Sequence, residues 1–496
     1  MRRLLCLVLA AVSANAAAIQ GVVLDHYSGR PLARSVVTLD VIEANGVTRL
    51  AVRTSGDGRF FFSPLNAGAY LLTAERPNYA TLKYGQKFWN APAAPIRLFD
   101  ETALFLDLRM HHLGAITGIV WDENEIGIAE QEVHVYRPAK PPVLLGRAKT
   151  DDRGVYRIGG LLPGSYLIRA GAKQLDDSTG VLPTFYKESL KVEEAKSISV
   201  ELDQQVQEIQ VRPTFGKLVS LSGRAWIVPA CPTLTVTLIS DMERKTVTGT
   251  PFSFEHLPRG DYELLAECDI PRNPTAFYQR FSIDRDTDGL NLNLAPMPVI
   301  QLSIEGADGK AIDTRSVRVL ARRKDLAGEG APLQLKDGMT LVPGRWELTV
   351  PPAGSLYPVS ISGGGPENPE RRRPDAWNEF LITRGRAALK ITMASGAGSV
   401  HGRVTQSLNE PAVGAPVYLE AYDPDSNQRL VDLRRTVTSA RGEYRFVGLT
   451  PGAYRIVSSF EFEDPDEQMM EFTRATRIAL RPASEAVQDL DLYTRP

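Results

Sequence analysis

The sequence is poor in cysteine and histidine and carries almost no net charge. Its 496 residues include three cysteines and six histidines, and 57 basic side chains stand against 59 acidic ones, for a formal net charge of -2. A nucleic-acid-binding protein needs an excess of Lys and Arg to neutralise phosphates, and no long basic run supplies one here. The composition therefore indicates a protein that does not bind nucleic acid.

Motifs of catalysis and cofactor binding are also missing. The histidines are scattered without an H-E-x-x-H or H-x-H pattern, and the sequence has no G-x-S-x-G elbow, no P-loop and no dinucleotide fingerprint. The run Asp284 to Gly289 resembles a calcium loop, but Ala295 stands where such a loop needs a bidentate Glu. We therefore expect no metal, no cofactor and no catalytic residue. An enzyme with an unrecognised site is the remote alternative.

Only one apolar run stands out, and it lies at the N-terminus. Arg2 and Arg3 precede the run Leu4 to Val12, and the small residues Ser13 to Ala18 follow. This order is typical of a secretory signal peptide, which we place at residues 1–18. The run is too short for a bilayer, and no second one approaches ~20 residues. We expect an exported chain without a transmembrane segment, located in the periplasm, at the cell surface or in the medium.

Removal of the signal peptide leaves two cysteines, Cys231 and Cys268. An exported chain meets an oxidising compartment in which such a pair can be oxidised. Two thiols cannot form a tetrahedral zinc site unaided, and no histidine lies at ligand spacing. We expect a structural disulfide between them, with two free buried thiols as the alternative.

Turn residues are abundant, and one segment recurs. The 40 Gly and 34 Pro are spread along the chain, as many tight turns require. Residues such as Phe60 and Phe62 alternate with period two, which predicts a strand with one buried face. A Gly turn then leads to an aromatic residue at the start of the next strand. The recurring segments span 57–72, 152–168 and 441–456, with weaker copies at 252–264 and 341–348.

The aromatic residue after the turn sets the length of the unit. It is Tyr70, Tyr166, Tyr262, Trp346 and Tyr454 in the five copies, and the first three lie 96 positions apart (166 − 70 and 262 − 166). We expect its polar atom to bond to a nearby backbone group, as buried tyrosines require. Six or seven short strands per unit predict a β-sandwich. We call the units repeats one to five: 19–112, 113–213, 214–297, 298–394 and 395–496.

The combined pattern resembles the carboxypeptidase regulatory-like domain. A first strand of the form x-x-G-x-V appears at Gln20-Gly21-Val22-Val23, and the Asp-x-Gly-x-aromatic strand and the Leu-x-Pro-Gly-x-Tyr turn follow. The resemblance is full in repeats one, two and five, moderate in repeat three and poor in repeat four. It implies a transthyretin-like β-sandwich related to collagen-adhesin B-type and starch-binding-like folds, as in multi-repeat exported bacterial proteins. We therefore expect an all-β fold with about five small Ig-like sandwiches in tandem.

Aromatic residues after the Tyr strand provide the remaining candidate site. Exposed rings can stack on sugar faces, and Tyr84, Trp89, Tyr186 and Tyr278 could do so; the alternative is that they pack against the sandwich. We expect a non-enzymatic structural or adhesion-type protein that binds a protein or glycan still to be identified. A carbohydrate-binding protein that uses these aromatics is the second hypothesis.

Overall fold

The computed structural model describes residues 17–494 apart from 44–45, 87–88, 90–92, 139–141, 227–230, 232, 269, 271–272, 327–329, 364–367, 372, 407–408 and 462–463. Strands and turns dominate these residues, and α1 (Glu467–Phe472) is the one α-helix among them. The predicted all-β class is therefore confirmed. Most of the predicted signal peptide lies outside the described residues. None of the helices in the described part of the chain has the length and apolar character that a membrane crossing requires.

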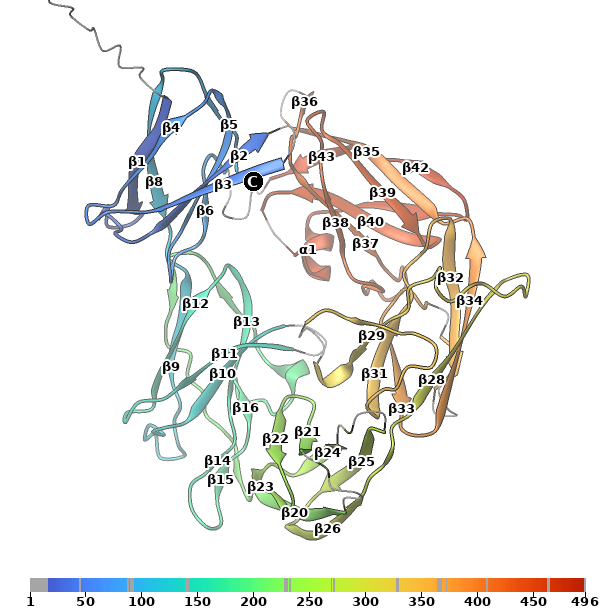
Figure 1. The fold of residues 1–496 in the computed structure, drawn as a ribbon. Coiled ribbons are helices and arrows are strands. Elements are labelled where there is room, and N and C mark those ends of the chain that lie inside the picture. Colours follow the sequence, from blue (N-terminus) through green and yellow to red (C-terminus); the bar gives the residue numbers. More distant parts are fainter. Residues whose placement is uncertain are drawn as a thin grey trace, which may run out of the picture. The chain divides into compact units, whose positions relative to one another are not determined.

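Repeat one, blue in Figure 1, has a three-stranded and a larger sheet around one core. The first sheet has the order β4-β1-β8, and the second has the order β3-β2-β5-β6, with β7 also paired to β5. Strands β1 and β8 run parallel although about eighty residues separate them. The strands are β1 (Ala17–Asp25), β2 (Val36–Glu43), β3 (Gly46–Arg53), β4 (Arg59–Leu65), β5 (Gly68–Glu75), β6 (Leu82–Lys83), β7 (Ile96–Leu98) and β8 (Ala103–Met110).

Repeat two uses the same strand order and adds short strands. Its sheets are β12-β9-β18, β11-β10-β13-β16 with β17 paired to β13, and β14-β15-β19. A 3-10 turn lies at Val192–Glu194. The strands are β9 (Gly114–Ile119), β10 (Glu132–Arg137), β11 (Val143–Lys149), β12 (Val155–Leu161), β13 (Gly164–Ala170), β14 (Lys173–Gln174), β15 (Gly180–Val181), β16 (Thr184–Phe185), β17 (Ile198–Val200), β18 (Gln205–Val206) and β19 (Phe215–Gly216).

Repeat three keeps the arrangement of repeat one, with sheets β23-β20-β26 and β22-β21-β24-β25-β27. Its core is separate from that of repeat one and draws on residues 219–292. The strands are β20 (Val219–Trp226), β21 (Leu234–Ile239), β22 (Arg244–Thr248), β23 (Phe252–Leu257), β24 (Gly260–Cys268), β25 (Thr275–Ile283), β26 (Thr287–Asn293) and β27 (Ala295–Pro296).

Repeat four differs from the others in one sheet. Its closing strand β34 lies between the first strand β28 and β32, in the order β28-β34-β32, beside a sheet β30-β29-β31-β33. This difference agrees with the weak motif in its sequence. The core draws on residues 300–393. The strands are β28 (Val299–Gly306), β29 (Leu320–Arg323), β30 (Leu333–Gln334), β31 (Gly344–Thr349), β32 (Leu356–Gly363), β33 (Asn378–Ile382) and β34 (Arg386–Ser395), with a 3-10 turn at Lys324–Leu326.

Repeat five joins its strands into one nine-stranded sheet, β36-β35-β43-β40-β37-β38, with β39 and β42 on β35 and β41 on β40. Helix α1 places Met470 against Tyr418 and Val457. The strands are β35 (Gly398–Gln406), β36 (Glu410–Pro411), β37 (Pro416–Ala421), β38 (Arg434–Val437), β39 (Glu443–Leu449), β40 (Gly452–Ser459), β41 (Thr476–Leu480), β42 (Glu485–Val487) and β43 (Leu490–Tyr493).

The chain divides into two compact units. The first comprises Met1–Thr117 with Arg157–Gly164 and Ser199–Glu208, and the second comprises Gly118–Tyr156 with Ser165–Ile198 and Ile209–Pro496. The first unit thus extends beyond repeat one and includes segments assigned to repeat two. The five domain boundaries expected from the sequence stay a prediction.

The glycine of the first strand is needed because a neighbouring strand passes too close for a side chain. A Cβ added to Gly21 would lie 1.9 Å from the carbonyl oxygen of Leu106, and one on Gly402 would lie 1.8 Å from that of Gln488. In repeat five the same Gln488 carbonyl accepts a hydrogen bond from the hydroxyl of Tyr444. In repeats one and five, this glycine therefore leaves room for a backbone carbonyl inside the sandwich.

The aromatic residue after the second turn closes a corner of the sandwich in repeats one, three, four and five. The hydroxyls of Tyr70, Tyr262 and Tyr454 donate to the carbonyl oxygens of the residues four positions earlier, at 2.7, 2.6 and 2.6 Å. Trp346 does the same with its indole N–H at 2.8 Å. These bonds satisfy buried polar atoms, as the sequence predicts, and they resemble the tyrosine corner of Ig-like sandwiches.

Candidate functional site

The two cysteines of the described chain are joined. Cys231 and Cys268 form a disulfide with a Cα–Cα distance of 5.9 Å, as the sequence leads us to expect. Cys268 ends β24 and is buried, and Cys231 packs on the core of repeat three. The bond closes a loop of 37 positions around strands β21 to β24. Its place in the core gives it a structural role.

Three of the four aromatic residues predicted to stack on sugars pack against other side chains. Tyr84 is half-buried and packs on the core of repeat one. Tyr186 is half-buried, with the ammonium of Lys187 lying 5.7 Å from its ring centre. Tyr278 packs on Ile239 and its neighbours, and burial raises the pKa of its hydroxyl. Their sugar-stacking role stays a prediction.

The fourth, Trp89, lines a cavity of about 460 Å³. His111, Asp203 and Glu201 face the same space, so an aromatic ring, an imidazole and two carboxylates share one cleft. The other lining residues are Ala80, Thr81, Leu82, Gln86, Pro163 and Leu202. Trp89 is half-buried, and Asp203 is already engaged by histidines, as described next.

A network of histidines and carboxylates fixes the end of repeat one. The carboxylate of Asp25 is buried and receives hydrogen bonds from the Ser28 hydroxyl at 2.8 Å and the Tyr79 hydroxyl at 2.9 Å. His112 Nε2 lies 2.6 Å from the same carboxylate. Burial opposes ionisation of Asp25, but these hydrogen bonds outweigh it and hold the pKa of the carboxyl well below its usual range. Burial beside Asp25 raises the pKa of Tyr79 to about 12.

A second carboxylate binds the adjacent residues. Asp203 accepts a hydrogen bond from the backbone N–H of His112 at 2.7 Å and lies 2.6 Å from His111 Nδ1. The His111 ring stacks on His26 with centroids 3.9 Å apart. Both carboxylates are used to hold the chain in place, which is a structural role for groups that could otherwise act as bases. Among the described residues, no group of three or more His, Cys, Asp or Glu is arranged to hold a metal.

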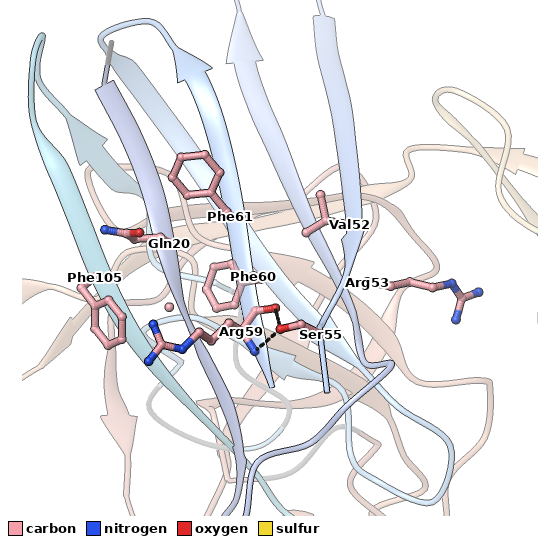
Figure 2. A pocket seen from close by; sticks show the side chains of 9 residues that line it. Gln20, Val52, Arg53, Ser55, Arg59, Phe60, Phe61 and Phe105 are labelled. Atoms are coloured by element: carbon pink, nitrogen blue, oxygen red, sulfur yellow. Dashed lines mark hydrogen bonds between the residues drawn. The ribbon is translucent and has the colours of Figure 1, made fainter. Parts of the chain in front are cut away.

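A second cavity lies on the outer face of repeat one. A cavity of about 540 Å³ is lined by Gln20, Phe60, Phe61, Phe105 and Arg59, together with Gly21, Val52, Arg53 and Ser55. Figure 2 shows Gln20 between the rings of Phe61 and Phe105, while Arg53 extends away from them. Phe61 and Phe105 expose 56% and 57% of their surface, whereas Phe60 is buried. The two outward rings are therefore available to a ligand.

The register explains why these three side chains form a row. Gln20 of β1 pairs with Phe61 of β4 in the antiparallel direction and with Phe105 of β8 in the parallel direction. Directly paired residues of neighbouring strands point to the same face of a sheet. The row Phe61–Gln20–Phe105, which we call the aromatic row, therefore crosses the sheet β4-β1-β8 at right angles to its strands.

Our sequence analysis missed the aromatic row, although half of its signal was present. In the run Phe60-Phe61-Phe62, burial of the outer two rings forces the middle ring to the opposite face. The same alternation turns Phe105 outward, between the inward residues Leu104 and Leu106. The pairing of β1 with β8, which brings Phe105 beside Gln20, has no local signature in the sequence.

The corresponding positions described in repeats three and five carry no aromatic ring of Phe, Tyr or Trp. In repeat five, His401 pairs with Arg445 on one side and Val487 on the other. In repeat three, Ser222 pairs with Ser253. The aromatic row is thus a property of repeat one and not of the fold, because these sandwiches form without it.

Comparison with known proteins identifies the domain type. The carboxypeptidase regulatory-like domain matches at residues 18–95 and 399–492. No curated protein sequence matches the chain. Solved structures with a similar fold include the minor pilin GBS52 of Streptococcus agalactiae, with 13% identity, 40% of this chain, 95% of that chain and a TM-score of 0.24.

Two further structures have similarly low sequence identity. The TIE protein of Bacillus anthracis has 11% identity, with 93% of this chain and 69% of that chain covered and a TM-score of 0.17. The shaft pilin SpaA of Lactobacillus rhamnosus GG has 10% identity, with 40% and 97% covered and a TM-score of 0.24. On the strength of the family match and the shared contacts described above, the chain carries the carboxypeptidase regulatory-like domain at its first and fifth repeats.

Proposed function

We propose that the protein is exported and acts without catalysis of its own, as a structural or adhesion-type protein. Its repeats would serve as a scaffold of stable sandwiches, and repeat one would present the binding surface. The partner is a protein or glycan outside the cytoplasm. The disulfide between Cys231 and Cys268 supports export, since such bonds persist in oxidising compartments.

The observation that carries this proposal is the aromatic row. Phe61 and Phe105 are each more than half exposed on a rigid sheet, and their hydrophobic surface is unfavourable in water. The fold does not require them, because repeat five has Arg445 and Val487 at the paired positions. Clustered exposed apolar residues with a polar surround are typical of interaction sites.

The polar clusters of repeat one support binding rather than catalysis. Asp25 and Asp203 are held by histidines, and each carboxylate oxygen that we describe is engaged in fixing the backbone or a ring. A nucleophilic site would instead need a hydroxyl or thiol beside a base that is itself oriented by a third group. The histidine–carboxylate contacts are best explained as supports for the end of repeat one.

The experiment combines localisation with surface binding. The full-length gene is expressed with a C-terminal epitope, and we expect processed protein outside the cytoplasm that associates with cell-envelope or extracellular material. A Phe61→Ser/Phe105→Ser variant should be exported equally but associate less. Unprocessed protein retained in the cytoplasm, or turnover of a substrate in a broad hydrolase screen, would refute the proposal.

A further inference from the structure

The aromatic row has a geometry that suits one class of ligand. Its two rings stand on the strands that flank β1, so the backbones that carry them are separated by two inter-strand spacings, or about 9.6 Å. Side chains stand roughly perpendicular to a sheet, and the rings therefore rise from the same face at this separation. The rings are too far apart to form a slot for one apolar side chain. They form two separate platforms instead.

A polar group lies between the two platforms. The side-chain amide of Gln20, which lines the same cavity, offers two donors and one acceptor. An apolar partner that covered the row would bury this amide without a partner, which is unfavourable. A ligand rich in hydroxyl groups would satisfy it. The row therefore selects a ligand with apolar patches at both ends and hydroxyl groups between them.

The charge around the row selects a neutral ligand. Arg59 lies beside the row, and its guanidinium is paired with the carboxylate of Asp57 at 2.9 Å. On the neighbouring row of the same face, Val22 separates Arg59 from Asp107. Asp57 thus neutralises Arg59, and Arg53 extends away from the rings (Figure 2), so the row itself offers no unpaired cation for phosphates or uronic acids. This balance also argues against single-stranded nucleic acid, which needs a basic groove in addition to stacking rings.

From these observations we infer that the aromatic row is a binding site for a neutral, extended β-linked polysaccharide. Each sugar of such a chain advances it by about one inter-strand spacing. Alternate sugars then stack their C–H faces on Phe61 and Phe105, and the sugar between them bonds to Gln20. The chain runs across the strands of the sheet β4-β1-β8. This inference rests on the proposed binding role of repeat one and specifies its ligand.

Binding of cellohexaose and chitohexaose to the full mature chain, measured by isothermal titration calorimetry, tests the site. We expect Phe61→Ala and Phe105→Ala each to weaken binding about tenfold, the effect of about 1.4 kcal/mol of lost stacking. Phe61→Trp should retain affinity because it keeps a ring. The matched control is Phe99→Ala, which removes a 69%-exposed ring of the same repeat that is outside the row. Hydrogen exchange of repeat one verifies that each variant is folded.

Leucine variants separate sugar stacking from apolar docking. Phe61→Leu/Phe105→Leu keeps the hydrophobic surface but removes the aromatic faces, and it should abolish hexasaccharide binding. Unchanged hexasaccharide affinity in this variant would overturn the stacking geometry, and absence of binding of either sugar to the wild-type chain would overturn the glycan assignment.

The surface-association assay keeps the two proposals distinguishable. If the chain associates with cell-envelope material through Phe61 and Phe105 but binds neither sugar, the binding role stands and the partner is a protein. If both sugars bind but the chain does not associate with any surface, the adhesion role fails and the glycan site stands.

Discussion

Removal of the buried carboxylate of Glu420 should destabilise repeat five more than any single surface change. Glu420 lies on β37 with no exposed surface, and it pairs with Arg455 on β40, which is 2% exposed. Its second oxygen lies 2.7 Å from Nε of Arg429. Arg455 also donates to Asn427 at 3.0 Å and lies over the ring of Tyr422, with 5.0 Å to the ring centre. One carboxylate thus balances two guanidinium groups.

The expected cost follows from this burial. Glu420→Gln keeps the shape of the side chain but leaves Arg455 buried without its counter-charge, which costs about 3–5 kcal/mol. Glu485→Gln is the matched control. Glu485 also pairs with an arginine of the same repeat, Arg445, at 3.1 Å, but both side chains of this pair are more than half exposed. An exposed pair of this kind contributes about 0–1 kcal/mol.

Hydrogen exchange measured by mass spectrometry on the full chain is the appropriate assay. A global unfolding curve would mix the transitions of several repeats. Hydrogen exchange avoids this, because peptides that cover Pro416–Ala421 and Gly452–Ser459 report on β37 and β40 alone. In Glu420→Gln, exchange through opening of this sheet should accelerate roughly a hundred- to a few thousand-fold. Equal acceleration in Glu485→Gln, or none in either variant, would refute the argument from burial.

Three further predictions concern repeats one and three. Replacing Cys231 and Cys268 with Ser should destabilise repeat three by about 4 kcal/mol, since the disulfide closes a loop of 37 positions; unchanged exchange in β21 and β24 would contradict this. Gly21→Ala places a Cβ 1.9 Å from a carbonyl oxygen and should cost about 1–3 kcal/mol or more, whereas Gly56→Ala, in open space, should be near neutral; hydrogen exchange of β1 measures both, and equal exchange in the two variants would contradict this. Because the pKa of Asp25 is lowered in the folded state, its carboxylate stabilises repeat one fully above about pH 4, and this stabilisation is lost as the pH falls toward the folded-state pKa. Proteolysis of repeat one between pH 2 and 6 should show this loss of stability in the wild type but not in Asp25→Asn.

The repeats were predictable because their signals are local. Period-two alternation at Phe60 and Phe62, the glycine of the first strand and the aromatic residue after the turn each follow from contacts within one sandwich. The weakness of the motif in repeat four also has a structural counterpart, since β34 lies between β28 and β32 there. The sequence analysis missed helix α1, a short helix of six residues capped by Asp466 and held by burial of Met470 against a sheet. Such packing has no periodic pattern in the chain.

The sequence by itself determined the fold class, the repeat and the identity of the two cysteines, because these depend on neighbours along the chain. The tertiary structure decided which side chains meet. Phe61, Gln20 and Phe105 form a row only because β8 returns beside β1 in parallel, and Glu420 meets Arg455 only because β37 pairs with β40. Strand register is set by the packing of whole sheets, and a local pattern of residues does not encode which distant strand will pair with which.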